Sequence, residues 1–297
     1  AAMYAPADTH FGLAGLKQLS GKELSYNNLL DLDAAVRIAG LIQNSGAAVI
    51  KHTNPCGAAS AASIDEALEA AMSADPTSAF GSIVAVNRVF DAAAAECLLK
   101  PGMFVEVIAA PAFTAEAVEA LKTRPAWKAS VRLVEVPPGD PWGPTAGLEL
   151  RSVAGAMLAQ RPDETPDDPA AWQVVTQEAP AEDLTQPLDF AFTMVRRLTS
   201  NAIAVCQGTS LVGAGVGQTS RVDAVRIALE KAGDRARGSV LASDAFFPFP
   251  DSIDFIRQAG VAAIIQPGGS KRDSEVIAAA NAAKLPMVFT SRRHFRH

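Results

Sequence analysis

Apolar residues between positions 32 and 42 recur at helical spacing, and a short continuous apolar run follows at 47–50. The first pattern predicts a helix that is capped by Asp31 or by an upstream asparagine. The second pattern predicts a short buried strand, which Pro55 and Gly57 prevent from continuing. The polar residues between this strand and Pro55 are therefore expected to form a turn at the strand's carboxyl end.

The alternation of helical and strand patterns continues to the end of the chain. Ser63-Ile64-Asp65-Glu66 predicts a capping box for a helix that Asp75-Pro76 stops. The other predicted elements are strands over 82–86 and 104–109, a helix over 114–122, and, in the second half, strands over 201–205, 211–214, 240–242, 261–265 and 287–289 with helices over 221–231, 253–258 and 274–283. Strands that alternate with helices favour an α/β fold with a largely parallel sheet.

Proline is dense from 125 to 187 and interrupts every candidate element there. This composition predicts connector or edge structure between a first α/β lobe with an N-terminal extension, residues 1–124, and a second α/β lobe, residues 188–297. Ser78-Ala79-Phe80-Gly81 and Ser243-Asp244-Ala245-Phe246-Phe247 echo each other weakly after helices in the two lobes. We therefore expect a duplication, with two similar lobes around one cleft.

Composition indicates a folded protein and argues against several functional classes. Of the 297 residues, 49% are hydrophobic and 20% are charged, which is typical of a folded chain, and the formal net charge of -6 argues against a sequence-tolerant nucleic-acid binder. Cys56, Cys97 and Cys206 are too few and too widely spaced for a disulfide framework or a CxxC metal site. Since no apolar run has bilayer length and the amino terminus does not resemble a signal, we expect a reducing, cytoplasmic location without membrane contact.

Lys51-His52 places a permanent cation beside an imidazole at the end of a predicted strand. Open α/β sheets bind ligands at the carboxyl ends of their strands, and the lysine favours the neutral histidine that accepts a proton at pH 7. This pattern indicates a catalytic pair. The ordinary alternative is a histidine with local hydrogen bonds beside a solvated lysine, and it is the more common outcome for an arbitrary Lys-His pair.

Four further segments are candidates for ligand binding. The glycine-rich run 213–218 precedes a predicted helix and is either a plain tight turn or a ligand cradle, since Gln218 replaces the third glycine of a dinucleotide fingerprint. Residues 242–251 combine phenylalanines, prolines and carboxylates, which suits either core packing or a planar heterocycle. The basic tail 291–297 and the turn 267–271 are candidate anion sites, although a basic tail is usually just solvated.

Together these segments resemble the transformylase domain of the bifunctional AICAR transformylase / IMP cyclohydrolase family. The match runs nearly end to end and keeps the family's order, which is more specific than any single motif. It departs from the family because the cyclohydrolase domain is absent from this chain, as is an Arg-Tyr-Gly-x-Asn-Pro-His-Gln segment, so ring closure to IMP is not expected of these residues. The matching blocks are residues 16–28, 51–57, 75–87, 104–111, 151–153, 200–203, 213–223, 243–254 and 266–273.

The resemblance implies a transferase that moves a formyl group from the cosubstrate 10-formyltetrahydrofolate to the 5-amine of AICAR, giving FAICAR and tetrahydrofolate in de novo purine biosynthesis. It implies that His52 accepts the proton, that Lys51 stabilises the transition state and that His297 orients His52. No divalent metal is expected. The residues implied to contact AICAR are Gly81, Glu106, Asn201, Arg221, Phe246 and Arg293, with Arg293 on the phosphate, and those implied to face the folate are Val222, Asp251, Ser270 and Lys271.

The resemblance also implies two related, cytidine-deaminase-like three-layer lobes and a homodimer whose active sites lie at its interface. A zinc nucleobase deaminase is therefore the first alternative. Its signature needs His-x-Glu and Pro-Cys-x-x-Cys, whereas Ala59 stands where the second cysteine belongs and Asn54 stands where the glutamate belongs. A folate- or nucleotide-binding protein without turnover is the second alternative, and the presence of Lys51 and His52 argues against it.

Overall fold

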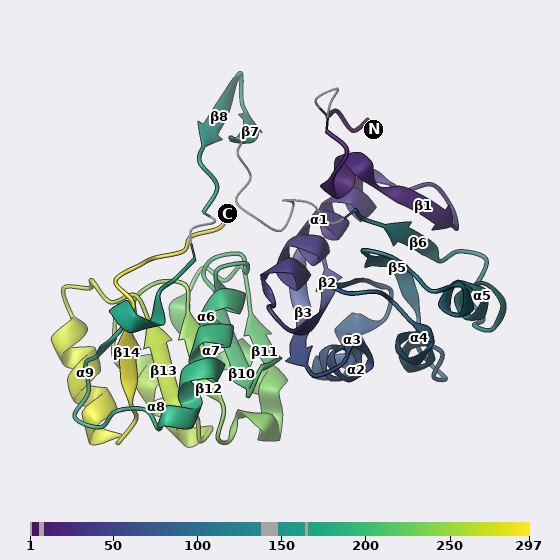
Figure 1. The fold of residues 1–297 in the computed structure, drawn as a ribbon. Helices are drawn as coiled ribbons and strands as arrows, with labels where there is room; N and C mark the ends of the chain where they lie inside the picture. The colour runs from purple at the N-terminus through teal and green to yellow at the C-terminus, as the bar shows by residue number, and fades with distance from the viewer. Residues whose placement is uncertain (1, 6–8, 138–147, 164–165) are drawn as a thin grey trace.

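The structure, a computed structural model, describes residues 2–5, 9–137, 148–163 and 166–297. Figure 1 shows two α/β halves that share one continuous sheet, with a small two-stranded hairpin projecting away from it. The sheet has 12 strands in the order β1-β6-β5-β4-β2-β3-β11-β10-β12-β13-β14-β9. This confirms the predicted α/β class.

The first half begins with a short 3-10 helix and one edge strand and then alternates strands with helices. Its elements are η1 (Gly12–Gly15), β1 (Lys17–Ser20), α1 (Tyr26–Leu41), β2 (Ser45–Lys51), β3 (Asn54–Ala61), α2 (Ile64–Ala74), α3 (Pro76–Ala79), β4 (Ser82–Val86), α4 (Ala92–Leu98), β5 (Val105–Ala110), α5 (Ala115–Thr123) and β6 (Arg132–Glu135).

The projecting hairpin consists of β7 (Glu149–Val153) and β8 (Ala156–Gln160). The second half then follows. Its elements are η2 (Pro169–Ala171), β9 (Gln173–Val174), η3 (Glu182–Leu184), α6 (Thr185–Val195), β10 (Ile203–Gln207), β11 (Ser210–Gly215), α7 (Arg221–Ala232), η4 (Gly233–Ala236), β12 (Val240–Ser243), α8 (Asp251–Gln258), β13 (Ala263–Gln266), α9 (Asp273–Ala282) and β14 (Met287–Phe289).

The prediction of a largely parallel sheet was wrong. Parallel pairing is confined to β4-β5-β6 and β12-β13-β14, and every other pair in the sheet is antiparallel. The reason is that β2 and β3 are joined only by His52-Thr53, and β10 and β11 only by Gly208-Thr209. Two-residue connections build hairpins, whereas parallel neighbours need a long crossover.

The two halves repeat one order of elements: a helix, a hairpin, and then three helix-strand units. The hydrogen bonds repeat as well. Asn87 Oδ1, just after β4, accepts from Gly46 N at 2.8 Å, and Asp244 Oδ1, just after β12, accepts from Ala202 N at 3.0 Å. The two hairpins meet at β3 and β11, which pair antiparallel across the middle of the sheet.

Helices cover both faces of the sheet, because each strand alternates its side chains between two apolar layers. Ala48 and Ile50 of β2 pack with α1 and α6, whereas Ala47 and Val49 of the same strand face α2, α4 and α5. In the second half, α7, α8 and α9 cover the equivalent face. None of the helices in the described ranges is both long and apolar enough to cross a bilayer.

Some predicted boundaries were wrong. α1 begins at Tyr26, not at residue 32, and its cap is Ser25 in a capping box with Asn28. The sequence pattern missed this start because Tyr26 and Leu30 are exposed, so the first turns carry no buried stripe. Ser63 precedes α2 but makes no side-chain cap bond.

The proline-rich segment 125–187 is more than a connector. Residues 132–135 form β6 and residues 173–174 form β9, an edge strand, and both belong to the main sheet. Residues 138–147 and 164–165, including Pro138, Pro141 and Pro144, lie outside the described residues.

Candidate functional site

The predicted site residues lie at one edge of the sheet, where some strands begin and others end. Ile50 near the end of β2 pairs with Ile83 near the start of β4, and Ile203 at the start of β10 pairs with Ser243 at the end of β12. Thr199 N donates to Asn54 Oδ1 at 3.0 Å, which joins the two halves at this edge. The first half thus contributes the amino ends of β4 and β5, while the second half contributes the carboxyl ends of β12, β13 and β14.

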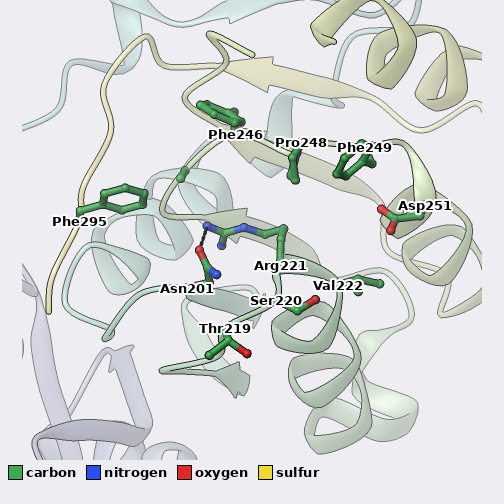
Figure 2. Close-up of a pocket in the computed structure, with 11 residues that line it drawn as sticks. Asn201, Thr219, Ser220, Arg221, Val222, Phe246, Pro248, Phe249, Asp251 and Phe295 are labelled. Carbon is green, nitrogen blue, oxygen red and sulfur yellow. Dashed lines mark hydrogen bonds between the residues drawn. The ribbon is translucent and has the colours of Figure 1, made fainter. Parts of the chain in front are cut away.

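A pocket of about 420 Å³ opens at this edge, entirely within the second half. Figure 2 shows Phe246, Pro248 and Phe249 in a row across the pocket from Thr219 and Ser220, with Arg221 between the two groups. Five sequence-predicted residues line it together: Asn201, Arg221, Val222, Phe246 and Asp251. The remaining lining residues are Thr219, Ser220, Ala245, Pro248, Phe249 and Phe295.

A buried ion pair forms the floor of the pocket. Arg221, the first residue of α7, donates from Nη1 to Asp244 Oδ1 at 2.5 Å and to the Ala202 carbonyl at 2.7 Å. The Asp244 side chain is 0% exposed and also accepts from Ser200 Oγ. Because each charge is surrounded by hydrogen-bonding partners, this pair is a fixed platform and not a mobile group.

Arg221 also orients Asn201. Its Nη2 donates to Asn201 Oδ1 at 3.0 Å, as the dashed line in Figure 2 marks, and Asn201 Nδ2 donates to the Gln218 carbonyl at 2.9 Å. These two hydrogen bonds fix the orientation of the amide, because the oxygen must face the guanidinium and the nitrogen must face the carbonyl. Asn201 therefore presents a fixed amide to the pocket.

The glycine-rich run does not form a cradle along its length. Gly213 and Gly215 lie in β11, where a Cβ atom would come within 2.1 Å of the Ala228 carbonyl oxygen and 2.0 Å of the Ala224 carbonyl oxygen. Their role is to let α7 pack closely on the strand. Only Gly217, with φ of +65°, stands in the turn before α7.

The aromatic loop after β12 divides between core and pocket. Phe247 is 0% exposed and belongs to the core, whereas Phe249 is 48% exposed, lines the pocket and lies under the Arg272 guanidinium at 4.8 Å. Ser270 and Lys271, which follow β13, do not line the pocket. The segment 242–251 thus contributes both to the core and to the wall of the pocket.

The basic tail folds back onto the pocket. Phe295 lines it, and the Arg293 guanidinium lies 4.6 Å from the Phe295 ring centre. His297 stacks edge-on against the same ring at 5.7 Å, and its carbonyl accepts from Arg151 at 2.7 Å. Within the described ranges, His297 shares no hydrogen bond with His52.

A buried histidine that the sequence did not single out anchors this tail. His294 is 1% exposed, with Nδ1 2.5 Å from Asp163 Oδ2 and Nε2 3.2 Å from Asp167 Oδ2. Burial alone would lower the pKa of His294, but its hydrogen bonds to Asp163 and Asp167 outweigh burial and raise it. No local signal marks this contact, because the partners lie more than 120 residues apart.

Lys51 and Gly81 lie together in the first half, and Glu106 lies near the start of β5, the strand next to β4. Lys51 Nζ donates to the Phe80 carbonyl at 2.5 Å and lies 3.4 Å from where a Cβ of Gly81 would be. Glu106 accepts from Asn28 Nδ2 at 3.2 Å. These residues share the sheet edge with the pocket but do not line it.

The His52-Thr53 turn is strained. Both residues have left-handed backbones, with φ of 52° and 61°, and such conformations cost non-glycine residues about 1–3 kcal/mol each. Thr53 N donates to Asp31 Oδ1 at 2.7 Å, so α1 holds the turn from one side. The result is an exposed imidazole on a short, tethered turn. β2 ends at Lys51, before this turn, and Pro55 and Gly57, which were expected to end strand structure, both lie in β3 (Asn54–Ala61).

Comparison with known proteins gives a consistent picture. Residues 1–231 match the family model described as the AICARFT/IMPCHase bienzyme. The chain is 51% identical over 298 residues to the bifunctional purine biosynthesis protein PurH of Rhodopirellula baltica, which covers 100% of this chain and 57% of that protein. PurH of Desulfitobacterium hafniense is 47% identical over 302 residues, covering 100% of this chain and 56% of that protein.

The chain thus spans a little over half the length of the curated relatives that it matches. Among solved structures, Acinetobacter baumannii RibD, form 2, aligns with a TM-score of 0.26 and 15% identity, covering 36% of this chain and 34% of that chain. A likeness this weak supports no argument about the fold.

Proposed function

This chain belongs to the AICARFT/IMPCHase bienzyme family, and from that membership we propose that it transfers a formyl group from 10-formyltetrahydrofolate to the 5-amine of AICAR in purine biosynthesis. The observation that carries the proposal is the pocket over the Arg221–Asp244 platform. Five residues implied by the family resemblance, drawn from separate segments of the second half, line this one pocket. The catalytic candidates Lys51 and His52 stand at the same edge of the sheet.

The chemistry needs a base and a cation. The AICAR amine attacks the formyl carbon, the bond from that carbon to the folate nitrogen breaks, and the amine proton must leave while the folate nitrogen gains one. His52, exposed on its turn, takes the amine proton. Lys51 has three donors and uses one on the Phe80 carbonyl, which leaves two for the oxyanion that develops on the formyl group.

We assign the AICAR contacts to Gly81, Glu106, Asn201, Arg221, Phe246 and Arg293. The fixed amide of Asn201 and the ring of Phe246 supply polar and stacking contacts to a flat heterocycle. For the folate we assign Val222, Asp251, Ser270 and Lys271, with the Asp251 carboxylate accepting from ring N–H groups. His297 is assigned to orient His52.

We further propose a homodimer with the active site at its interface. All residues of β7 and β8 are exposed, including Leu150, Val153, Met157 and Leu158. A lone two-stranded hairpin is marginally stable in water, so apolar side chains on it favour cover by a second copy. The separation of Lys51 from the pocket also favours a site that two copies complete.

The finer fold assignment rests on the repeated topology. It supports two related, cytidine-deaminase-like three-layer lobes, the first reaching β6 (Arg132–Glu135) and the second beginning at α6 (Thr185–Val195), so that both extend beyond 1–124 and 188–297 into the segment 125–187. The free thiols of Cys56, Cys97 and Cys206 suit a reducing compartment, and we assign the cytoplasm.

Turnover after treatment with a chelator tests this function against the zinc deaminase. Ala59 and Asn54 stand where the zinc deaminase signature needs its second cysteine and its glutamate, so that signature is incomplete here. EDTA-treated protein should therefore still convert AICAR and 10-formyltetrahydrofolate to FAICAR and tetrahydrofolate, as measured by product analysis. Stoichiometric zinc together with deamination of a nucleobase, and no formyl transfer, would replace the proposal with the alternative.

Substitution of Arg293 tests the phosphate contact. A guanidinium fork on a phosphate is a charge-assisted contact of roughly 1.5–3 kcal/mol, so Arg293→Ala should weaken AICAR binding about tenfold to a hundredfold in calorimetry, with little change in folate affinity. Arg293→Lys should give an intermediate loss, because lysine keeps the charge but not the fork.

The matched control for Arg293 is Arg124→Ala, which removes an exposed arginine paired with Glu96 in the first half. This control should leave AICAR affinity unchanged. If Arg293→Ala binds AICAR as tightly as the control does, the tail is only a solvated end and the assignment is wrong.

A further inference from the structure

Arg296 joins the C-terminal tail to the turn that carries His52. Its Nη1 donates to the Thr53 carbonyl at 3.3 Å and to the Arg197 carbonyl at 2.6 Å. The backbone of Arg296 is fixed as well, since Ser200 N donates to the Arg296 carbonyl at 2.8 Å. Arg296 does not line the pocket, and its side chain contacts the candidate site through the Thr53 carbonyl of the turn.

The His52-Thr53 turn depends on hydrogen bonds from side chains outside it. A two-residue hairpin of this kind requires positive φ at both central residues and normally uses asparagine and glycine, whereas here the residues are histidine and a β-branched threonine. Their own backbone preference would open the turn. Three side chains hydrogen-bond the backbone of the turn and hold it closed. Asp31 accepts from Thr53 N, Arg296 donates to the Thr53 carbonyl, and Asn54 Nδ2 donates to the His52 carbonyl at 3.1 Å.

Two of these contacts bind the same residue, Thr53, one on each of its two flanking peptide groups. Asp31 holds the N–H of Thr53 from α1, and Arg296 holds its carbonyl from the tail, so the left-handed residue is clamped between two charged side chains of different elements. The partly buried guanidinium also bonds the Arg197 carbonyl, at the end of α6, so the turn is fixed against the second half.

We propose that Arg296 is a positioning residue that holds the His52-Thr53 turn in the conformation from which His52 acts. The inference rests on the proposed function only for the catalytic role of His52. The ordering of the turn by the Arg296 guanidinium does not depend on that function. Loss of Arg296 should therefore lower kcat and loosen the backbone of the turn, while the affinity for AICAR depends on other residues.

A double-mutant cycle in the full-length protein tests the proposal. Arg296→Ala should lower kcat about tenfold with KM for AICAR within about twofold, and should speed amide hydrogen exchange of the peptide spanning residues 51–55 about tenfold. Thr53→Gly removes the backbone cost of the left-handed residue while keeping its carbonyl and the His52 side chain. In the Thr53→Gly background both effects of Arg296→Ala should therefore shrink, which a merely structural role of the tail would not produce.

Two further variants keep the test decisive. Arg296→Lys, which retains the stem and the charge but not the planar guanidinium whose Nη1 donates to both carbonyls, should fall between wild type and Arg296→Ala. It substitutes for the alanine variant should that variant fail to fold. Arg124→Ala should leave both readouts unchanged.

Unchanged exchange at residues 51–55 in Arg296→Ala would overturn the proposal whatever the activity. So would a raised KM for AICAR with unchanged kcat, since that pattern marks a nucleotide contact. Failure of the proposed function has a different signature, in which the wild-type protein shows no formyl transfer while the exchange effect of Arg296→Ala persists and supports the ordering of the turn.

Discussion

His52→Ala is expected to lower formyl-transfer turnover by about a hundredfold or more, while AICAR still binds. The AICAR amine is a weak nucleophile, so the transfer depends on removal of its proton as the new bond forms. His52 is the exposed imidazole on the strained turn at the sheet edge, next to Lys51 in the sequence. Loss of the ring removes the proton acceptor but none of the pocket-lining side chains over Arg221.

The measurements are kcat by steady-state product formation and AICAR affinity by calorimetry. His10→Ala is the matched control, because His10 is also exposed but lies outside the candidate site, and it should leave turnover unchanged. A His52→Ala protein with near-normal kcat would remove His52 from the mechanism. A variant that no longer binds AICAR would show that the ring contributes to binding and not only to proton transfer.

Asp244→Ala should destabilise the protein by about 3–5 kcal/mol, the range for breaking a buried ion pair by removing one partner. The substitution leaves the Arg221 guanidinium buried without its counter-charge and strips the Ala202 N–H and the Ser200 hydroxyl of their acceptor. Because Arg221 also orients Asn201, AICAR binding should weaken in the same variant.

The free energy of unfolding from urea titration measures this effect. The matched control is Glu96→Ala, which breaks the exposed pair with Arg124 and should leave the free energy of unfolding almost unchanged. If Asp244→Ala and Glu96→Ala lose the same small amount, the Arg221–Asp244 pair does not stabilise the pocket floor.

From β10 onward the second half of the fold follows from local sequence signals, whereas β9 and α6 were not predicted. The pattern predicted a strand over 240–242 and a helix from Arg221, and the structure has β12 over Val240–Ser243 and α7 over Arg221–Ala232. An apolar run bounded by glycine marks a strand, and charged residues in a first turn mark the start of a helix. Both signals are local properties of the chain. They therefore mark an element whatever it packs against.

The missed features depend on non-local contacts. Pro55 and Gly57 indicated the end of a strand, yet both lie in β3, which begins at Asn54 and pairs with β2 across a register shift between Val49 and Ile50. The direction of neighbouring strands depends on connection length, so the boundary error at β3 became the error about a parallel sheet. The anchoring of His294 by Asp163 and Asp167 has no sequence period to reveal it.

The site was predicted in the same uneven way. Motif blocks identified Asn201, Arg221, Val222, Phe246 and Asp251, which the fold brings to one pocket. The sequence did not reveal that Asp244 pairs with Arg221 or that Arg296 reaches Thr53, because both contacts arise only when distant segments pack together.

The claim that one sheet edge binds the nucleotide for formyl transfer is tested most directly by a structure of the full-length protein with AICAR and a non-reactive folate analogue bound. We expect AICAR in the pocket over Arg221, its phosphate on Arg293, and its 5-amine within about 2.6–3.2 Å of a ring nitrogen of His52 from the same or a second copy of the chain. AICAR bound away from this pocket, or with no His52 ring near its amine, would contradict the account.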